Sequence, residues 1–79
     1  MNKGMNQGLI SAAEIVKRFG ITYQAVNHYT NLGLLDVVTK NGNVRMYSRI
    51  EVRRRLVQTA ELVSEGYSLM LIRKKLTEM

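Results

Sequence analysis

Residues 15–32, with the sequence IVKRFGITYQAVNHYTNL, carry the strongest indication of the fold. Apolar residues at helical spacing lead up to Gly20, and glycine is the residue type that most readily ends a helix in a left-handed turn. Thr22 has the side chain of a helix N-cap, so a second helix is expected to begin directly after it. The segment therefore predicts two helices joined by a tight turn, which is the pattern of a helix-turn-helix.

The second of these helices has a polar outer face that differs from an ordinary mixture of Lys and Glu. Val26 and Tyr29 lie three residues apart and should face inward, which turns the polar residues between them outward. Asn and Gln can pair bidentately with adenine, while His and Tyr can contact bases, phosphates or sugars. A solvated helix face is the alternative, and Tyr29 is either a core residue or a phosphate donor. The DNA contacts predicted on this helix are Thr22, Tyr23, Gln24, Asn27, His28 and Tyr29.

The flanking segments extend the pattern in both directions. Ser11 and Glu14 have the spacing of a capping box at the start of the first helix, and residues 1–8 are expected to form a polar tail. Two short runs of β-favouring residues, 37–39 and 44–47, flank the sequence KNGN, in which Asn-Gly is a strong hairpin signal. Polar residues are common at hairpin tips. A basic tip also suits contact with the DNA backbone or minor groove, here through Lys40, Asn43 and Arg45.

Two more helices are expected after the hairpin. The third is predicted over about residues 50–65, with Ser48 as its N-cap and Gly66 at its end. Ser68 then opens a short fourth helix. The buried stripe of the third helix is predicted to contain Val52, Leu56, Ala60 and Val63, widened by Val57 and Leu62.

Composition narrows the classes of function. The sequence has twelve Lys and Arg residues but only six Asp and Glu. The resulting net charge of +6 favours binding to a polyanion, with nucleic acid the first candidate and anionic lipid the second. Arg18 is accordingly added to the predicted DNA contacts. The sequence has no Cys and a single His, so we expect no disulfide, no metal site and no cofactor. No apolar run could cross a bilayer, so residues 9–79 are expected to form one cytoplasmic, nucleoid-associated domain.

The order helix, turn, helix, two-stranded wing, helix, helix resembles the winged-helix DNA-binding domain of the MerR family of bacterial regulators, and more distantly that of excisionases. The matching stretches are SAAEIVKRFGIT, VNHY, GLL, VRMYS and EGYSLMLIRKKL, which together cover about residues 10–76. The resemblance implies a mainly α fold of four helices and a two-stranded β-hairpin, and it equates Arg45 with the family's wing arginine. The chain departs from the family in its second helix. Where the family usually has Arg, an aromatic residue, Tyr and an acid, this sequence has Asn27, His28, Tyr29 and Thr30.

Three functions are compatible with these observations. The first is sequence-specific binding of double-stranded DNA as a bacterial or phage transcription regulator, with the second helix in the major groove and with homodimer formation, on DNA or otherwise, left open. The second is an excisionase-like or architectural protein that bends DNA, and the third is a protein-interaction module on the same fold. Full-length family members continue into a dimerisation helix and an effector-sensing region, and no small-molecule effector is expected for residues 1–79. Catalysis is not expected, because the sequence has no glycine-rich phosphate loop, no cysteine nucleophile and no carboxylate spaced to orient His28.

Overall fold

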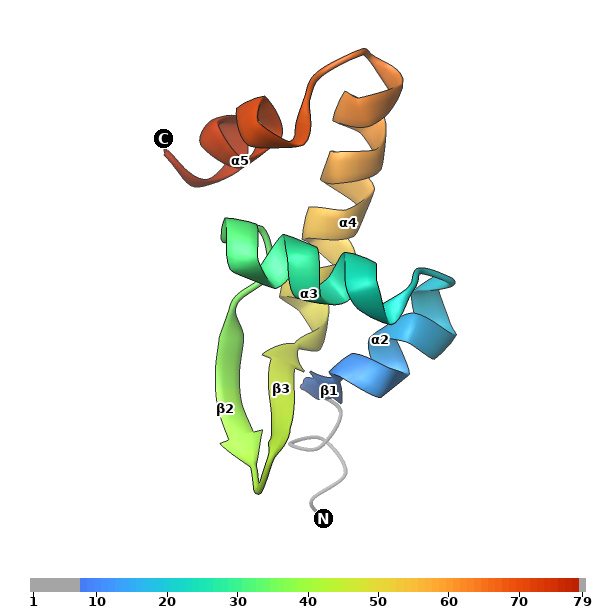
Figure 1. The fold of residues 1–79 in the computed structure, drawn as a ribbon, viewed down its shortest axis with the longest axis vertical. Coiled ribbons are helices and arrows are strands. Elements are labelled where there is room, and N and C mark those ends of the chain that lie inside the picture. The colour runs from blue at the N-terminus through green and yellow to red at the C-terminus, as the bar shows by residue number, and fades with distance from the viewer. Residues whose placement is uncertain (1–7, 79) are drawn as a thin grey trace.

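The structure is a computed structural model that describes residues 8–78 (Figure 1). Within this range, four helices and a small antiparallel sheet confirm the winged helix-turn-helix expected from the sequence. The predicted tail lies outside the described residues except for Gly8, whose carbonyl oxygen accepts a hydrogen bond of 3.0 Å from the Arg49 backbone N–H. The elements are β1 (Leu9–Ser11), α2 (Ala12–Phe19), α3 (Tyr23–Leu32), β2 (Val37–Asn41), β3 (Val44–Ser48), α4 (Arg49–Ser64) and α5 (Leu69–Thr77).

Hydroxyl side chains begin all four helices, as predicted. Each accepts a hydrogen bond from the backbone N–H three residues later, and the four caps are Ser11, Thr22, Ser48 and Ser68. At the first of them the Glu14 carboxylate also accepts from the Ser11 backbone N–H at 2.9 Å, so the capping box is present. Gly20 and Gly33 end α2 and α3 with left-handed φ angles of 67° and 90°. Local sequence therefore sets the boundaries of the helix-turn-helix.

The sheet has three strands in the order β1-β3-β2, so β3 is its centre. The sequence predicted the hairpin of β2 and β3 but not β1, which pairs with the opposite edge of β3 and places Ile10 across from Tyr47. The hairpin is also longer than expected. Its strands reach Asn41 and begin again at Val44, which leaves Gly42 and Asn43 as the two-residue turn.

The core lies where α2, α3, α4 and the sheet meet. The buried members of its central cluster are Ile10, Ala12, Ile15, Val26, Leu35, Tyr47 and Val52. The Tyr47 ring is only 1% exposed, and its hydroxyl lies 2.8 Å from Thr30 Oγ1 on α3. Tyr47 is therefore a core residue, and its hydroxyl links the wing to α3.

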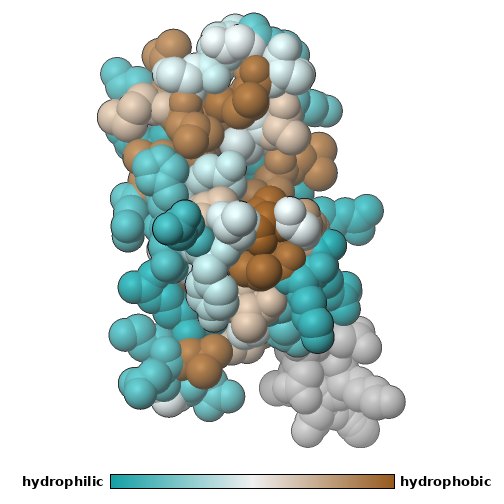
Figure 2. All heavy atoms as spheres, turned by 45° about the vertical axis from the view of Figure 1, so that its right-hand side comes forward, coloured by the Kyte–Doolittle hydropathy of each residue, from teal (hydrophilic) through white to brown (hydrophobic). Residues whose placement is uncertain are grey.

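The predicted buried stripe of α4 is partly wrong. Val52 is buried and Leu56 is half-buried, but Ala60 is exposed and Val57 and Val63 are 53% and 50% exposed. Thr59, not predicted to face inward, is only 4% exposed. The reason is that α4 extends beyond α2 and α3, as Figure 1 shows, so its far half has fewer neighbours to bury its apolar residues. Figure 2 shows the hydrophobic residues that remain at the surface on this side.

Candidate nucleic-acid interface

The outer face of α3 presents its polar side chains to solvent. Val26 is completely buried, which fixes the rotation of the helix about its axis. On the opposite side Gln24, Asn27 and His28 are exposed, and Tyr23 is 53% exposed. No side-chain hydrogen bond ties Gln24 or Asn27 to another residue of the described range. Both amides are therefore free to bind a ligand.

Two of the residues predicted to contact DNA from this helix have structural roles. Thr22 is exposed, and its Oγ1 accepts the hydrogen bond of 3.0 Å from Ala25 N–H that begins α3. Tyr29 is half-buried and lines a groove between α3 and α4 together with Leu56. Its ring centroid lies 6.3 Å from that of His28. Tyr29 thus sits at the border between the core and the outer face.

The wing carries a second group of predicted contacts. Lys40, Asn43 and Arg45 are all exposed, and Lys40 and Arg45 are directly opposite each other in the β2–β3 register. Like charges in such a cross-strand pair destabilise a sheet. No carboxylate among residues 8–78 lies within 4 Å of either charge. The wing tip therefore concentrates positive charge without an internal counter-charge.

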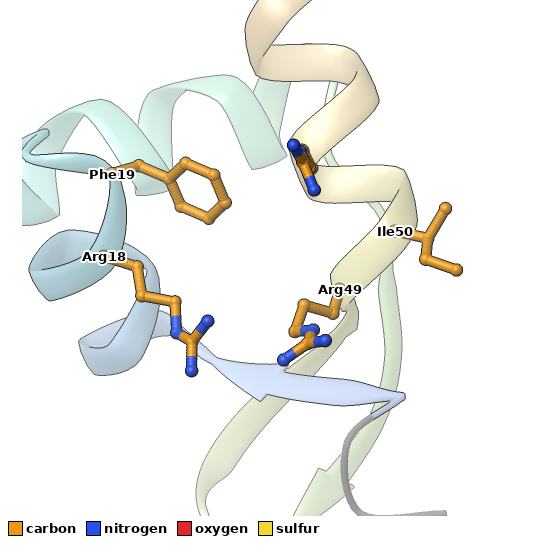
Figure 3. Close-up of a pocket in the computed structure, with 5 residues that line it drawn as sticks. Arg18, Phe19, Arg49 and Ile50 are labelled. Atoms are coloured by element: carbon orange, nitrogen blue, oxygen red, sulfur yellow. The ribbon is translucent and has the colours of Figure 1, made fainter. Parts of the chain in front are cut away.

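The structure does not bring Arg18 together with the outer face of α3 or with the wing. Arg18 is exposed near the end of α2 and lines a pocket between α2 and α4 with Arg49 and Arg53. In Figure 3 the side chains of Arg18 and Arg49 extend into the same space between these helices. Sequence reasoning missed Arg49 as a member of a cluster. Arg49 lies at the start of a predicted helix, where the helix dipole disfavours positive charge, and this unusual position could have marked it as a candidate for binding an anion.

Several other charges are engaged within the fold. Glu51 forms ion pairs with Arg54 and Arg55, and Glu78 pairs with Arg73 at 3.2 Å. The hydrogen bond from the Ser11 backbone N–H lowers the pKa of Glu14, with smaller contributions from the Ser11 hydroxyl, Arg18 and Lys17, against the opposing effect of burial. The cations without a carboxylate partner within 4 Å among residues 8–78 include those of the wing and of the pocket between α2 and α4, and also Lys17, Lys74 and Lys75.

The described residues contain no group of three or more His, Cys, Asp or Glu side chains that could hold a metal ion. No helix in this part of the chain is long and apolar enough to cross a membrane.

Comparison with known proteins agrees with this geometry. The model of the MerR HTH family of regulatory proteins matches residues 10–79, which include every helix and both strands of the wing. No curated protein and no solved structure matches the chain. The family match nevertheless spans most of the sequence, and it agrees with the helix-turn-helix and wing. The chain therefore belongs to the MerR HTH family of regulatory proteins, whose members bind DNA and regulate transcription.

Proposed function

We propose that this protein regulates transcription by binding double-stranded DNA sequence-specifically, with α3 in the major groove and the β2–β3 wing on the backbone or minor groove. The observation that carries the proposal is the exposed pair Gln24 and Asn27, whose amides have no hydrogen-bond partner within residues 8–78. An amide side chain matches the donor and acceptor of adenine in the major groove. We expect this regulator to act in the bacterial cytoplasm, in association with the nucleoid.

The other predicted contacts take supporting roles in this proposal. His28 contacts a base or a phosphate, and Tyr23 donates to a phosphate or packs against a sugar. Phosphate contacts set the register of the protein on the duplex without reading its sequence. We assign such contacts to Thr22, Tyr29, Lys40, Asn43, Arg45 and Arg18.

A single module of this size should bury only about 600–1,000 Å² of protein surface on DNA, so one copy is expected to bind weakly. Specific regulation would then require two copies on a two-fold symmetric site, with half-sites about one helical turn apart or a multiple of that spacing. No effector is needed for this mode of binding.

Selection of bound sequences from a random duplex pool, at two salt concentrations, tests the proposal. A sequence-specific DNA-binding protein should enrich one motif at both salt concentrations, whereas general attraction to polyanions enriches none. The Asn27→Ala variant should then lose preference at one position of the motif, by about 1–3 kcal/mol. An unchanged motif for this variant would contradict the assignment of α3 to the major groove.

Two other functions make different predictions. An excisionase-like protein should give tandem footprints and bend DNA, which shifts the gel mobility of duplexes that carry the site at different positions. A protein-interaction module should show no salt-dependent affinity for any duplex. The exposed charges of Lys40 and Arg45 favour DNA binding over this last function.

A further inference from the structure

Three arginines from two helices line one pocket at the surface of the molecule. Arg18 comes from the last turn of α2, and Arg49 and Arg53 come from the first two turns of α4. Because Arg49 and Arg53 are four residues apart, they lie on the same side of α4. In Figure 3 the side chains of Arg18 and Arg49 extend into the space between the two helices. The fold therefore gathers three permanent positive charges around one space.

The acidic residues close to this pocket in the sequence are engaged elsewhere. None of the three guanidinium groups lies within 4 Å of a carboxylate of residues 8–78. Glu51 belongs to the first turn of α4, but its carboxylate pairs with Arg54 and Arg55. Glu14 attracts Arg18 over a longer distance, while its carboxylate accepts the hydrogen bond that begins α2. The pocket thus keeps its positive charge.

The start of α4 adds to the positive potential of the pocket. The first turn of an α-helix carries unpaired backbone N–H groups and the positive end of the helix dipole, and both favour an anion. Arg49 and Ile50 are the first two residues of this 16-residue helix, and both line the pocket. A half-buried arginine at the start of a helix is unfavourable by itself, and an anion bound between the arginines removes this penalty.

The chemistry of the pocket matches phosphate. Guanidinium groups donate pairs of parallel hydrogen bonds to phosphates and carboxylates, and arginine suits such bidentate contacts better than lysine does. A carboxylate has two oxygens and suits one arginine, whereas a terminal phosphate has three acceptor oxygens and linked phosphates have more. The pocket has a volume of about 310 Å³, about ten times that of one water molecule in the liquid, so it has room for two linked phosphates.

We infer that Arg18, Arg49 and Arg53 form a phosphate-binding site that is separate from the outer face of α3 and from the wing. The phosphate belongs either to a free molecule with two or more linked phosphates or to the DNA backbone beyond the part that α3 reads. The same guanidinium chemistry recognises both sources. For the DNA source the inference rests on the proposed function, and it gives Arg18 two partners in its phosphate contact. For a free molecule it is independent of that function.

Titration of the isotope-labelled full chain with pyrophosphate tests the site without DNA. The measurement is NMR at a constant ionic strength of about 0.15 M, which screens general attraction between exposed charges. Backbone resonances of residues 18–19 and 49–53 should shift together and saturate, with a dissociation constant of about 1 mM or below. The resonances of Lys40 and Arg45 should shift less and should not saturate in the same range, because the wing has two exposed cations and no pocket around them.

A matched pair of variants separates the pocket from net charge. Arg49→Gln should weaken pyrophosphate binding at least about tenfold, because it removes a charge-assisted bidentate contact. Arg54→Gln makes the same change at an exposed position of the same helix, where the charge is already paired with Glu51, and it should leave the affinity unchanged. Pyrophosphate should also raise the melting temperature of the parent and of Arg54→Gln, but not that of Arg49→Gln. Circular dichroism without pyrophosphate verifies that each variant folds.

The salt dependence of duplex binding identifies the source of the phosphate. If the site holds a DNA phosphate, Arg49→Gln should reduce the slope of log affinity against log salt by about 0.9, and Arg54→Gln should not. If the site holds a free molecule, Arg49→Gln should lose affinity for pyrophosphate and keep the slope of the parent.

Two results would overturn the inference. The first is the absence of saturable shifts around the pocket together with an unchanged slope of duplex binding for Arg49→Gln. The second is an equal loss of pyrophosphate affinity in Arg49→Gln and Arg54→Gln, because the anion then responds to net charge alone. A protein that binds pyrophosphate in the pocket but binds no duplex contradicts the proposed function alone. A protein that selects a DNA motif but shows neither effect of Arg49→Gln contradicts this inference alone.

Discussion

The hydroxyl pair of Thr30 and Tyr47 shows how much one residue can constrain the position of the wing. Thr30 Oγ1 lies 2.7 Å from the Val26 carbonyl oxygen, to which it donates its only proton. In its contact of 2.8 Å with Tyr47, Thr30 must therefore accept, and the Tyr47 hydroxyl must donate. The phenol of β3 thus depends on α3 for its hydrogen-bond partner.

Because Tyr47 donates this hydrogen bond, removing the acceptor should cost more stability than removing the donor. Thr30→Val should cost about 1–3 kcal/mol of unfolding free energy, because it leaves the buried Tyr47 donor unsatisfied. Tyr47→Phe should cost less, about 0.5–1.5 kcal/mol, because Thr30 keeps its bond to Val26. The double variant should be more stable than the sum of the two losses implies. Urea unfolding followed by circular dichroism measures the unfolding free energy of all three variants. Equal losses for the two single variants would contradict the assignment of Tyr47 as the donor.

Glu14 gives a prediction about pH. The backbone hydrogen bond from Ser11 lowers the Glu14 pKa below its ordinary value of 4.5 in the folded state. A lowered folded-state pKa stabilises the fold above the ordinary value, and this contribution is lost as pH falls through the folded-state pKa. Glu14→Gln keeps an acceptor for Ser11 but cannot titrate, so its melting temperature should fall less between pH 7 and pH 3. An equal fall in the melting temperatures of the parent and the variant would contradict this contribution of Glu14.

At the scale of elements, the sequence predicted what local chemistry decides. The four hydroxyl caps and the left-handed glycine at the end of α2 depend on residues within a few positions of one another, and all were recognised. The strand β1 was not, because three residues become a strand only through pairing with β3, about 37 positions away in the chain. The exposure of Val57 and Val63 was missed for a similar reason, since apolar spacing does not reveal where the neighbouring helices end. The exposed amides of α3 could be predicted from spacing alone, whereas the cluster of Arg18, Arg49 and Arg53 joins two helices distant in sequence.

The turn between α2 and α3 can be tested at Gly20. A Cβ atom at this position would meet no atom within 4 Å, so the cost of a substitution comes from the backbone alone. Gly20→Ala should lose about 1–2 kcal/mol of stability, the usual cost of a left-handed conformation for a residue with a side chain. Gly20→Asn should lose less, because Asn tolerates this conformation better. Thermal and urea unfolding compare the two, and an Ala variant as stable as the parent would contradict the role of the turn.

For DNA binding by the molecule as a whole, the positions of the charged side chains matter more than the net charge of +6. Among the described residues, cations without carboxylate partners lie at the wing, between α2 and α4, and in the last turn of α5. The logarithm of the affinity for DNA should therefore fall linearly with the logarithm of the salt concentration. The slope should be about 0.9 for each phosphate that the protein contacts.

Arg45→Ala should reduce this slope by about 1 and weaken all sequences alike. Arg54→Ala removes an exposed arginine that is already paired with Glu51, and it should leave the slope unchanged. Fluorescence anisotropy of a labelled duplex at several salt concentrations measures both variants. If Arg45→Ala left the slope intact, the wing would not touch phosphate.

The strand β1 also affects how shortened forms of this protein would behave. Its three residues occupy the side of β3 that faces away from β2, and Ile10 fills the core beneath them. A version beginning at Ala12 would leave the backbone donors and acceptors of β3 open along that side, next to a cavity where the isoleucine had been. Open strand edges recruit strands from other molecules, so such a version is expected to aggregate even though every residue of its helices and of the wing is present.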